Sequence, residues 1–309
     1  MERWISETFH AHWRPSMRAD KVLHEVKTDH QHLVIFENEF WGRVLLLDGV
    51  FQLTTRDEFV YHEMMAHIPL MALERPAKVL IIGGGDGGLL REVLKHPSVK
   101  SATLVEIDQS VIDTALEYYP EIGRKAFKDK RVNVVITDGR QFVAETAETF
   151  DVVIADSSEP IGPSAVLHTR AFFADCKRCL KPGGVFITQS GLPFHQPKHL
   201  ERTTKALASL YEDVHPYAFT HPCYFGGEFT AVWASDDKSL RQATPAVIGR
   251  RMSRRGIKTR YWTPQIQQGA FALPRYIEAI AEKATAPKSS KPRAATQRGA
   301  SASKRSAGK

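Results

Sequence analysis

The stretch KVLIIGGGDGGLLREVLKHPSVKSATLVEID, from Lys78 to Asp108, decides the fold. Its opening run KVLII is short and mostly apolar and stops at glycine, which is typical of a strand buried on both faces of a parallel sheet. The segment from Leu89 to His96 predicts a helix, and Ala102 to Ile107 predicts a second strand. Glycines between the first strand and the helix allow positive φ angles and close approach of a ligand. Glu106, near the end of the second strand, stands where a Rossmann-type site binds ribose hydroxyl groups.

One residue of the glycine loop, Asp86, does not fit a dinucleotide site. Such a loop offers backbone N–H groups and a helix N-terminus to a pyrophosphate, which a carboxylate at its centre would repel. Two unit charges about 4 Å apart interact by about 4 kcal/mol at an effective dielectric constant of roughly 20. This is enough to decide which end of a ligand lies beside the loop. Asp86 therefore predicts a ligand whose nearby end is cationic.

Further strands are expected along the chain, and acidic residues stand at their carboxyl ends. Val132 to Thr137 leads into Asp138-Gly139, Asp151 to Ala155 leads into DSSE, and Val185 to Gln189 follows a KPGG turn that starts at Lys181. Strands separated by helices form a parallel sheet that binds ligands outside the carboxyl ends of its strands. Five carboxylates should therefore line one rim, where only a cationic ligand would relieve their mutual repulsion: Asp86, Glu106, Asp138, Asp156 and Glu159.

Residues 1–56 predict a small N-terminal antiparallel β domain. Its apolar runs are separated by turn residues, of which Asp48-Gly49 is a strong hairpin signal. A unit of this size buries too little surface alone, so it must pack on the large domain or on a second copy, and a homo-oligomer is expected. A helix with Thr55 and Glu58 at capping-box spacing follows. Its Tyr61 and His62 lie either on a polar helix face or toward the glycine-loop crevice.

Residues 57–284 predict the large Rossmann-like domain, of the methyltransferase type. Tyr224, in HPCYFGG, precedes a strand that suggests an antiparallel hairpin closing the sheet. The basic stretch from Arg241 to Arg255 is interpreted as a solvated helix face, and a last helix should end near Ala284. The fold class is thus α/β, with a small N-terminal β domain.

Residues 285–309 predict a disordered basic tail. The chain has 42 basic and 35 acidic residues, and seven of the basic residues, but no acid, fall after Ala284. The folded part is therefore neutral, and the tail lacks the hydrophobic residues needed to fold. A solvated extension is favoured over contact with nucleic acid.

No apolar run approaches the roughly 20 residues of a membrane span, and the first residues lack the apolar core of a signal peptide. A cytoplasmic enzyme fits these features.

Cys176 and Cys179 form a C-x-x-C motif inside a helical pattern, without the second ligand pair that zinc needs, and are expected to be buried helix residues. The His10/His12 and His30/His32 pairs lack completing ligands, so no metal site is expected.

Several motifs together resemble the bacterial spermidine synthases, a family of polyamine aminopropyltransferases. The resemblance covers residues 1–284 and rests on KTDHQ (27–31), GRVLLLDG, TRDEFVYHEMM, VLIIGGGDGG, VEID, TDG (137–139), DSSEPIGP (156–163) and FALPRY. It implies transfer of an aminopropyl group from decarboxylated S-adenosylmethionine, a co-substrate, to putrescine, which yields spermidine and 5′-methylthioadenosine. No further cofactor is implied, and a homodimer or homotetramer is expected.

The resemblance also implies roles for individual residues. In the donor nucleoside site, Glu106 would hold the ribose and Asp138-Gly139 the adenine, with Gln31 and Pro163 beside them. Asp156 would accept the proton and, with Asp86, hold the donor's amine. The remaining polyamine-site residues would be Tyr61, His62, Ser157, Ser158, Glu159, Gln189 and Tyr224.

The chemistry of the reactants agrees with these roles. The donor presents a sulfonium and an ammonium, which suits an acidic rim. An amine with a pKa near 10.4 must lose a proton before it attacks, which costs about 4 to 5 kcal/mol at about pH 7. The segment Glu159 to Thr169 is a candidate lid that excludes water. Where the family usually has a second aspartate this chain has Glu159, one methylene longer, so its preference among diamines is open.

Four other functions remain to be separated from this one. A methyltransferase that uses intact S-adenosylmethionine would share the sheet and the ribose acid, but Asp86 and Asp156 disfavour the carboxylate of its cofactor. A nicotinamide dehydrogenase is disfavoured by Asp86 alone. A nonenzymatic polyamine-binding module would show no turnover, and a nucleic-acid binder would lose salt-sensitive DNA binding without residues 285–309.

Overall fold

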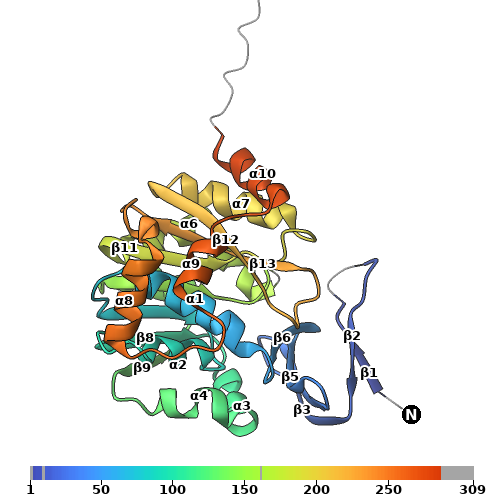
Figure 1. Ribbon diagram of the computed structural model, residues 1–309. Coiled ribbons are helices and arrows are strands. Elements are labelled where there is room, and N and C mark those ends of the chain that lie inside the picture. The colour runs from blue at the N-terminus through green and yellow to red at the C-terminus, as the bar shows by residue number, and fades with distance from the viewer. Residues whose placement is uncertain (1–2, 9–10, 161, 287–309) are drawn as a thin grey trace, which may run out of the picture.

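The computed structural model describes residues 3–8, 11–160 and 162–286. A seven-stranded sheet forms its centre (Figure 1). The strand order is β12-β13-β11-β10-β7-β8-β9. Neighbours among β7 to β11 are paired in parallel, and β13 is antiparallel to both β11 and β12. The predicted α/β sheet, with its closing hairpin, is confirmed. The strands are β7 (Lys78–Gly83), β8 (Ser101–Glu106), β9 (Val132–Ile136), β10 (Phe150–Asp156), β11 (Leu180–Gln189), β12 (Asp213–Thr220) and β13 (Glu228–Ser235).

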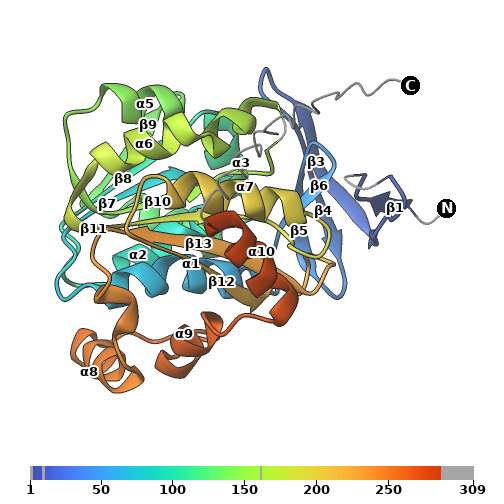
Figure 2. The same ribbon diagram turned by 90° about the horizontal axis from the view of Figure 1, so that it is seen from above.

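Helices cover both faces of this sheet, as Figure 2 shows from above. The apolar strand residues from Val79 to Ile82 are fully buried, alternately in two cores. This is the reason why their sequence is continuously apolar. One face carries α1 (Glu58–Ala72), α2 (Gly88–Leu94), α8 (Pro245–Arg255) and α9 (Pro264–Ala270). The other carries α5 (Gly139–Glu145), α6 (Arg170–Arg178), α7 (Pro197–Ala208) and α10 (Arg275–Thr285).

Four shorter or peripheral helices complete the large domain. Two of them, α3 (Gln109–Tyr118) and α4 (Pro120–Phe127), connect β8 to β9. The 3-10 helices are η1 (Gly162–His168) and η2 (Leu240–Gln242). None of the helices in the described part of the chain combines the length and apolarity needed to cross a bilayer. Most of the predicted tail, residues 287–309, lies outside the described residues, and α10 extends one residue past the predicted end.

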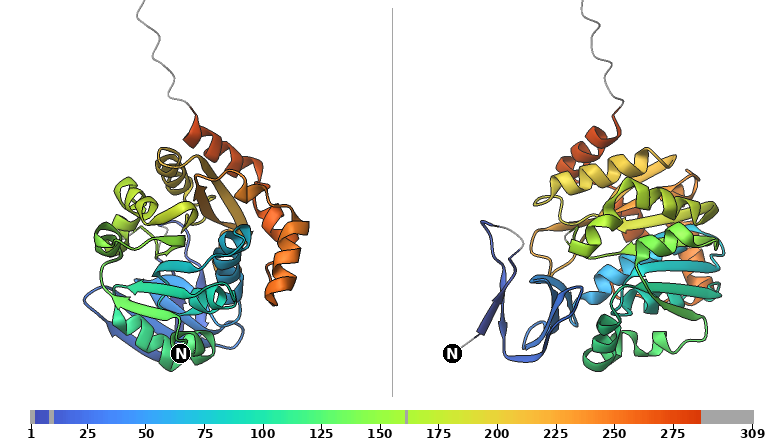
Figure 3. Two further views of the ribbon diagram at one scale, coloured as in Figure 1. Left: turned by 90° about the vertical axis from the view of Figure 1, so that its left-hand side faces the viewer. Right: turned by 180° about the vertical axis from the view of Figure 1, so that it is seen from behind.

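The N-terminal residues form a four-stranded antiparallel sheet and a two-stranded ribbon. The ribbon stands on the side of this sheet away from the central sheet (Figures 1 and 3). Asp48 and Gly49 both have positive φ angles, 50° and 76°, at the tight turn that their sequence predicts. The strands are β1 (Arg3–Ser6) and β2 (Ser16–Ala19) in the ribbon, and β3 (Lys21–Lys27), β4 (His32–Asn38), β5 (Gly42–Leu47) and β6 (Val50–Thr54) in the sheet.

The predicted capping box at the start of α1 is wrong. The N-cap residue is Asp57, and the hydroxyl oxygen of Thr55 accepts a hydrogen bond from the backbone of Arg43, in β5, at 3.1 Å. The Glu58 carboxylate contacts the Nδ1 atom of His62 at 2.6 Å and the guanidinium of Arg91 at 2.8 Å. Charge-assisted bonds of this kind are stronger than a bond to a backbone amide, so Glu58 turns inward.

Two other local predictions are also corrected by tertiary contacts. The expected turn that starts at Lys181 lies inside β11, where the pairing with β10 shifts register, so the extra residues form a bulge. The basic helix α8 is not simply a solvated face. Arg251 donates hydrogen bonds to the carbonyls of Met71 and Ala72, and Arg255 donates to those of Leu70, Leu73 and Glu74. These side chains satisfy carbonyl groups that the C-terminus of α1 leaves without helical partners.

Candidate active site

A cavity opens at the carboxyl ends of the parallel strands, between the large domain and the N-terminal sheet. It lies where the strand order reverses, with Gly83 at the end of β7 paired to Asp156 at the end of β10. Ligands of open α/β sheets bind at such switch points. The cavity brings together all but one of the predicted site residues: Gln31, Tyr61, His62, Asp86, Glu106, Asp138, Gly139, Asp156, Ser157, Ser158, Glu159, Gln189 and Tyr224. The exception is Pro163, which lies in η1 and whose side chain is outside the described part of the structure.

The glycine loop lets two carboxylates approach the backbone closely. Gly84 has a φ angle of 71°, and a Cβ atom there would lie 2.9 Å from the Oδ2 atom of Asp156. A Cβ atom on Gly85 would lie 2.9 Å from the Oε2 atom of Glu106. Any larger residue would therefore displace the acids that face the loop. The loop's sequence thus determines the position of these acidic groups.

Asp86 has an internal cationic partner, His62. The Nε2 atom of His62 lies 3.2 Å from Asp86, and its Nδ1 atom lies 2.6 Å from Glu58. Burial alone would lower the pKa of His62, but Asp86 and Glu58 outweigh it and raise this pKa to about 10. His62 is therefore an imidazolium ion that lies between two carboxylates. The expectation that it faces the crevice is met, while the roles of Glu58 and Arg91 in holding it were missed because local spacing suggested a capping box.

Asp156 combines burial with a single strong hydrogen bond. The hydroxyl group of Tyr61 donates to its Oδ1 atom at 2.6 Å. Burial and the charge of Asp86 raise the pKa of Asp156 to about 6, although His62 and Tyr61 act in the opposite direction. A carboxylate with a pKa near neutrality is suited to accept and return a proton. The hydroxyl of Tyr224 instead donates to the carbonyl of Gln52 at 2.7 Å, toward the N-terminal sheet.

Glu106 lies at the end of β8 and is 7% exposed. Its Oε1 atom accepts hydrogen bonds from the backbone of Ile107 at 2.9 Å and of Asp108 at 3.1 Å. Burial is the largest influence and raises the pKa of Glu106 to about 7, against these two hydrogen bonds. Gln31, from the N-terminal domain, donates to Asp108 at 3.2 Å and so reaches the same corner. Asp138 accepts from the backbone of Arg140 at 2.7 Å as the N-cap of α5.

The loop after β10 is held by two glutamines. Gln189 donates to the carbonyls of Ser157 at 3.1 Å and Ser158 at 3.3 Å. Gln196 donates to the Oε2 atom of Glu159 at 2.8 Å. Burial, with a contribution from the charge of Glu7, raises the pKa of Glu159 to about 7.

Glu7 and Gln196 were missed in the sequence. Glu7 follows β1 and lines the cavity, and its side chain accepts a hydrogen bond from the backbone of Phe51 at 3.0 Å. It lies 152 positions before Glu159 in the chain, so no local pattern connects the two acids. Among the described residues that line the cavity there is no lysine or arginine. The imidazolium of His62 is shared by two carboxylates, so the acids of the lining outnumber its cationic side chains and favour a cationic ligand.

Two family models match this chain. The model described as the spermine/spermidine synthase domain matches residues 58–243, and the model described as the spermidine synthase tetramerisation domain matches residues 3–55. Together they cover the N-terminal β strands and the large domain as far as residue 243.

Curated relatives and solved structures agree with the family models. A polyamine aminopropyltransferase of Pseudomonas syringae pv. tomato is 47% identical over 90% of this chain and 98% of its own length. Polyamine aminopropyltransferase 1 of Pseudomonas aeruginosa is 48% identical over 88% of this chain and 95% of its own length. The crystal structure of a spermidine synthase in complex with the transition state analogue AdoDATO superposes with a TM-score of 0.86 and 32% identity, covering 91% of this chain and 96% of that one. The spermidine synthase of Thermotoga maritima gives a TM-score of 0.83 at 32% identity, covering 91% of this chain and 95% of that one.

These matches extend over most of this chain and most of each relative, and the superpositions agree with the fold described above. The chain therefore belongs to the spermidine synthase family of polyamine aminopropyltransferases.

Proposed function

We propose that the protein transfers the aminopropyl group of decarboxylated S-adenosylmethionine to putrescine, giving spermidine and 5′-methylthioadenosine. The observation that carries this proposal is the placement of Asp86 in the glycine loop and of Asp156 beside it, in a cavity whose described lining has no lysine or arginine. The likeness to a spermidine synthase that was crystallised with a transition state analogue supports the same reaction. Both reactants are cations, so the cavity matches them in charge.

The donor is proposed to lie along the carboxyl ends of β7, β8 and β9. Glu106 would accept hydrogen bonds from its ribose hydroxyl groups, and Asp138 with Gly139 would border the adenine. Gln31 would cover the nucleoside from the N-terminal domain. The aminopropyl group would then extend over the glycine loop, with its ammonium group near Asp86 and Asp156. An intact methionine carboxylate in that place would be repelled by the same two side chains.

The proposed reaction is a direct displacement. One ammonium group of putrescine loses a proton to Asp156, either directly or through Tyr61, whose hydroxyl group is bonded to it. The neutral nitrogen attacks the methylene carbon beside the sulfonium, a C–N bond forms, and the C–S bond breaks with its electron pair passing to sulfur. The products are a neutral thioether and spermidine, and one proton is released to solvent for each turnover.

The proton transfer opposes the attraction between carboxylate and ammonium. The amine has an ordinary pKa near 10.4, so its neutral form costs about 4 to 5 kcal/mol at about pH 7. Asp156 favours the ammonium, whereas the nearby sulfonium and the removal of water favour the neutral amine. Alignment of the two reactants contributes the rest of the acceleration, since positioning alone can contribute about 7 to 11 kcal/mol.

The far end of the acceptor is proposed to contact Glu159. Its carboxylate accepts a hydrogen bond from Gln196, and the nearby charge of Glu7 contributes to raising its pKa. A second ammonium group between Glu159 and Glu7 would relieve this repulsion. The distance between the carboxylates of Asp156 and Glu159 would then select the length of the diamine. The extra methylene of Glu159 changes this distance, so it affects the choice of acceptor.

We also propose that the enzyme is a cytoplasmic homo-oligomer. The match to a tetramerisation domain covers residues 3–55, and Trp4 and Phe40 in this domain are 58% and 57% exposed. Exposed aromatic side chains on a small β domain favour burial against a second copy. Sedimentation velocity on the full chain and on a Trp4→Glu variant tests this, and a wild-type protein that stays monomeric would contradict it.

The function is tested by incubating the protein with decarboxylated S-adenosylmethionine and diamines of different length, followed by mass analysis of the products. We expect methylthioadenosine and the aminopropyl derivative of putrescine in equal amounts. Calorimetry with the intact and decarboxylated donors separates this reaction from methyl transfer. Tighter binding of the intact donor, or no product from any diamine, would overturn the proposal.

A further inference from the structure

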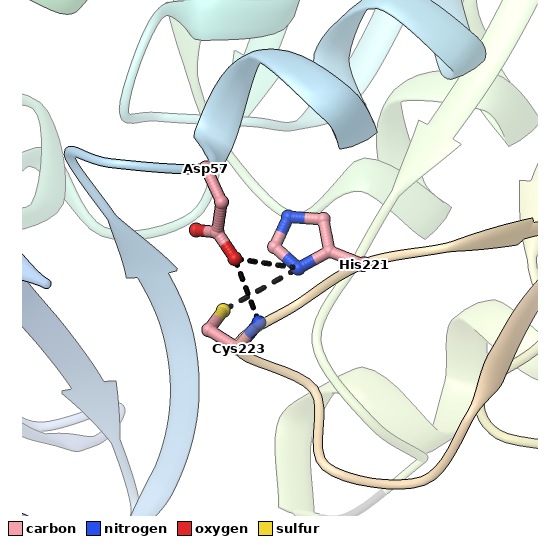
Figure 4. Close-up of side chains that lie close together, drawn as sticks. All are labelled: Asp57, His221 and Cys223. Carbon is pink, nitrogen blue, oxygen red and sulfur yellow. Dashed lines mark hydrogen bonds and ion pairs between the residues drawn. The ribbon is translucent and has the colours of Figure 1, made fainter. Parts of the chain in front are cut away.

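Three side chains of types that can bind a metal ion lie together where the connection between β12 and β13 meets the start of α1, and one of them, His221, lines the cavity. Asp57, His221 and Cys223 each offer one ligand atom, and these atoms all lie within 4.8 Å of one another (Figure 4). The three residues are 4%, 2% and 0% exposed. Asp57 and His221 are 164 positions apart in the sequence, so only the fold brings the set together.

The two separations measured from His221 are close to those around a tetrahedral zinc ion. The Sγ atom of Cys223 lies 3.4 Å from the Nδ1 atom of His221, and the Oδ2 atom of Asp57 lies 3.5 Å from the same nitrogen. Zinc bonds of about 2.3 Å to sulfur and about 2.0 Å to nitrogen or oxygen place tetrahedral neighbours about 3.6 Å and about 3.3 Å apart. The Oδ2 atom of Asp57 also accepts a hydrogen bond from the backbone N–H group of Cys223 at 2.7 Å, which holds this oxygen beside the other two ligand atoms.

The same geometry argues against a nucleophilic cysteine. In a catalytic triad the nucleophile contacts one ring nitrogen of histidine and the carboxylate contacts the other. Here both Cys223 and Asp57 contact Nδ1. The thiol and the carboxylate therefore lie beside the same ring nitrogen and not on opposite sides of the ring. Three ligand atoms grouped in this way can bind one ion.

From this arrangement we infer that Asp57, His221 and Cys223 form a binding site for a zinc-class divalent ion. One oxygen, one nitrogen and one sulfur ligand suit Zn²⁺ or Co²⁺, whereas Mg²⁺ and Ca²⁺ prefer oxygen ligands alone. Three bonds form, the thiol proton of Cys223 passes to solvent, and a water molecule or an added ligand can complete the tetrahedron.

The site connects two segments that line the cavity. Asp57 is the N-cap of α1, which carries Tyr61 and His62, and the connection from β12 to β13 carries Tyr224 beside its two ligands. The ring of His221 stacks on Tyr224 with centroids 4.2 Å apart. A bound ion would join these segments, so it would stabilise the folded state and restrain the wall of the active site.

Spectroscopy on the full-length protein, freed of metal with a chelator, tests the inference. Titration with Co²⁺ should produce a thiolate-to-cobalt charge-transfer absorption that saturates at one equivalent. Cys223→Ser should lose this absorption, and the matched control Cys176→Ala, at another buried cysteine, should keep it. Zn²⁺ should raise the melting temperature of the wild type in a concentration-dependent way, while Mg²⁺ should not.

A measurement on the wild type keeps the test valid if a variant fails to fold. X-ray absorption of the zinc-loaded protein should show a single sulfur ligand at about 2.3 Å together with nitrogen or oxygen ligands. Two sulfur ligands would assign the ion to Cys176 and Cys179, and no sulfur would assign it to other residues. Either result, or a cobalt spectrum without the charge-transfer absorption, would overturn the inference.

Discussion

Binding of the nucleoside product is expected to depend on the ionisation of Glu106. In the ligand-free protein, burial raises the pKa of this carboxyl group to about 7. Two ribose hydroxyl groups can both donate to a carboxylate, whereas a protonated carboxyl group loses part of its acceptor capacity. Bound nucleoside should therefore lower the pKa of Glu106. At any pH at which Glu106 is protonated in the free protein, binding should then release a proton.

The magnitude follows from the size of that pKa change. If binding returns Glu106 to its ordinary pKa of about 4.3, the Kd weakens almost tenfold for each pH unit below about pH 7. Between about pH 8 and about pH 5 this is roughly 80-fold, or about 2.6 kcal/mol. The ligand for this test is 5′-methylthioadenosine, because it carries no charge over this range and its pH dependence reports protein groups. Calorimetry in buffers of different ionisation enthalpy measures both the Kd and the protons released.

Two variants make the assignment specific. Glu106→Gln should bind weakly with a flat pH profile. Asp138→Asn removes a carboxylate from the same cavity but leaves Glu106 in place, so the slope should remain. A wild-type Kd that is constant over the range, or a slope that survives in Glu106→Gln, would show that an ionised Glu106 does not hold the ribose.

Three further predictions concern the proton acceptor, the acceptor site and the internal cation. Asp156→Asn should lower kcat by about 10²- to 10⁴-fold while the Kd for methylthioadenosine changes little, and unchanged turnover would remove Asp156 from the mechanism. Glu159→Asp should shift kcat/KM toward diamines longer than putrescine, because the shorter side chain withdraws the distal carboxylate; an identical diamine profile would contradict this. His62→Gln should lower the free energy of unfolding by up to about 5 kcal/mol below about pH 6.5 and by much less above about pH 10. This follows because the folded-state pKa of His62 is raised to about 10, so its stabilisation is lost as the pH rises through that value. Urea unfolding at both pH values measures the difference, and an equal loss at both would refute the charge argument.

Local sequence signals were reliable where the backbone itself is constrained. Three features appear in the structure as their sequences predict: the apolar run before the glycine loop, the Asp48-Gly49 turn, and the hairpin whose connection contains Tyr224. These features depend on strand burial and on positive φ angles, which a few adjacent residues decide. The rim of acids could also be predicted, because parallel strands bring their carboxyl ends to one edge of the sheet.

Predictions failed for side chains that can bind either a local partner or a residue from a distant part of the chain. Glu58 has the spacing of a capping box, yet it binds His62 and Arg91. Arg255 has the sequence context of a solvated helix face, yet it satisfies carbonyls at the end of α1. In each case a partner supplied by the packing of distant elements offers a stronger interaction than solvent or the local backbone.

The amino-acid sequence by itself determined the α/β class, the family motifs and the acidic character of the cavity, since these depend on residue type and short-range order. Only the tertiary structure decided the ionisation of the acids, because desolvation and the distance between charges depend on segments far apart in the chain. It makes His62 an internal counter-ion for Asp86, and it brings Glu7 toward Glu159.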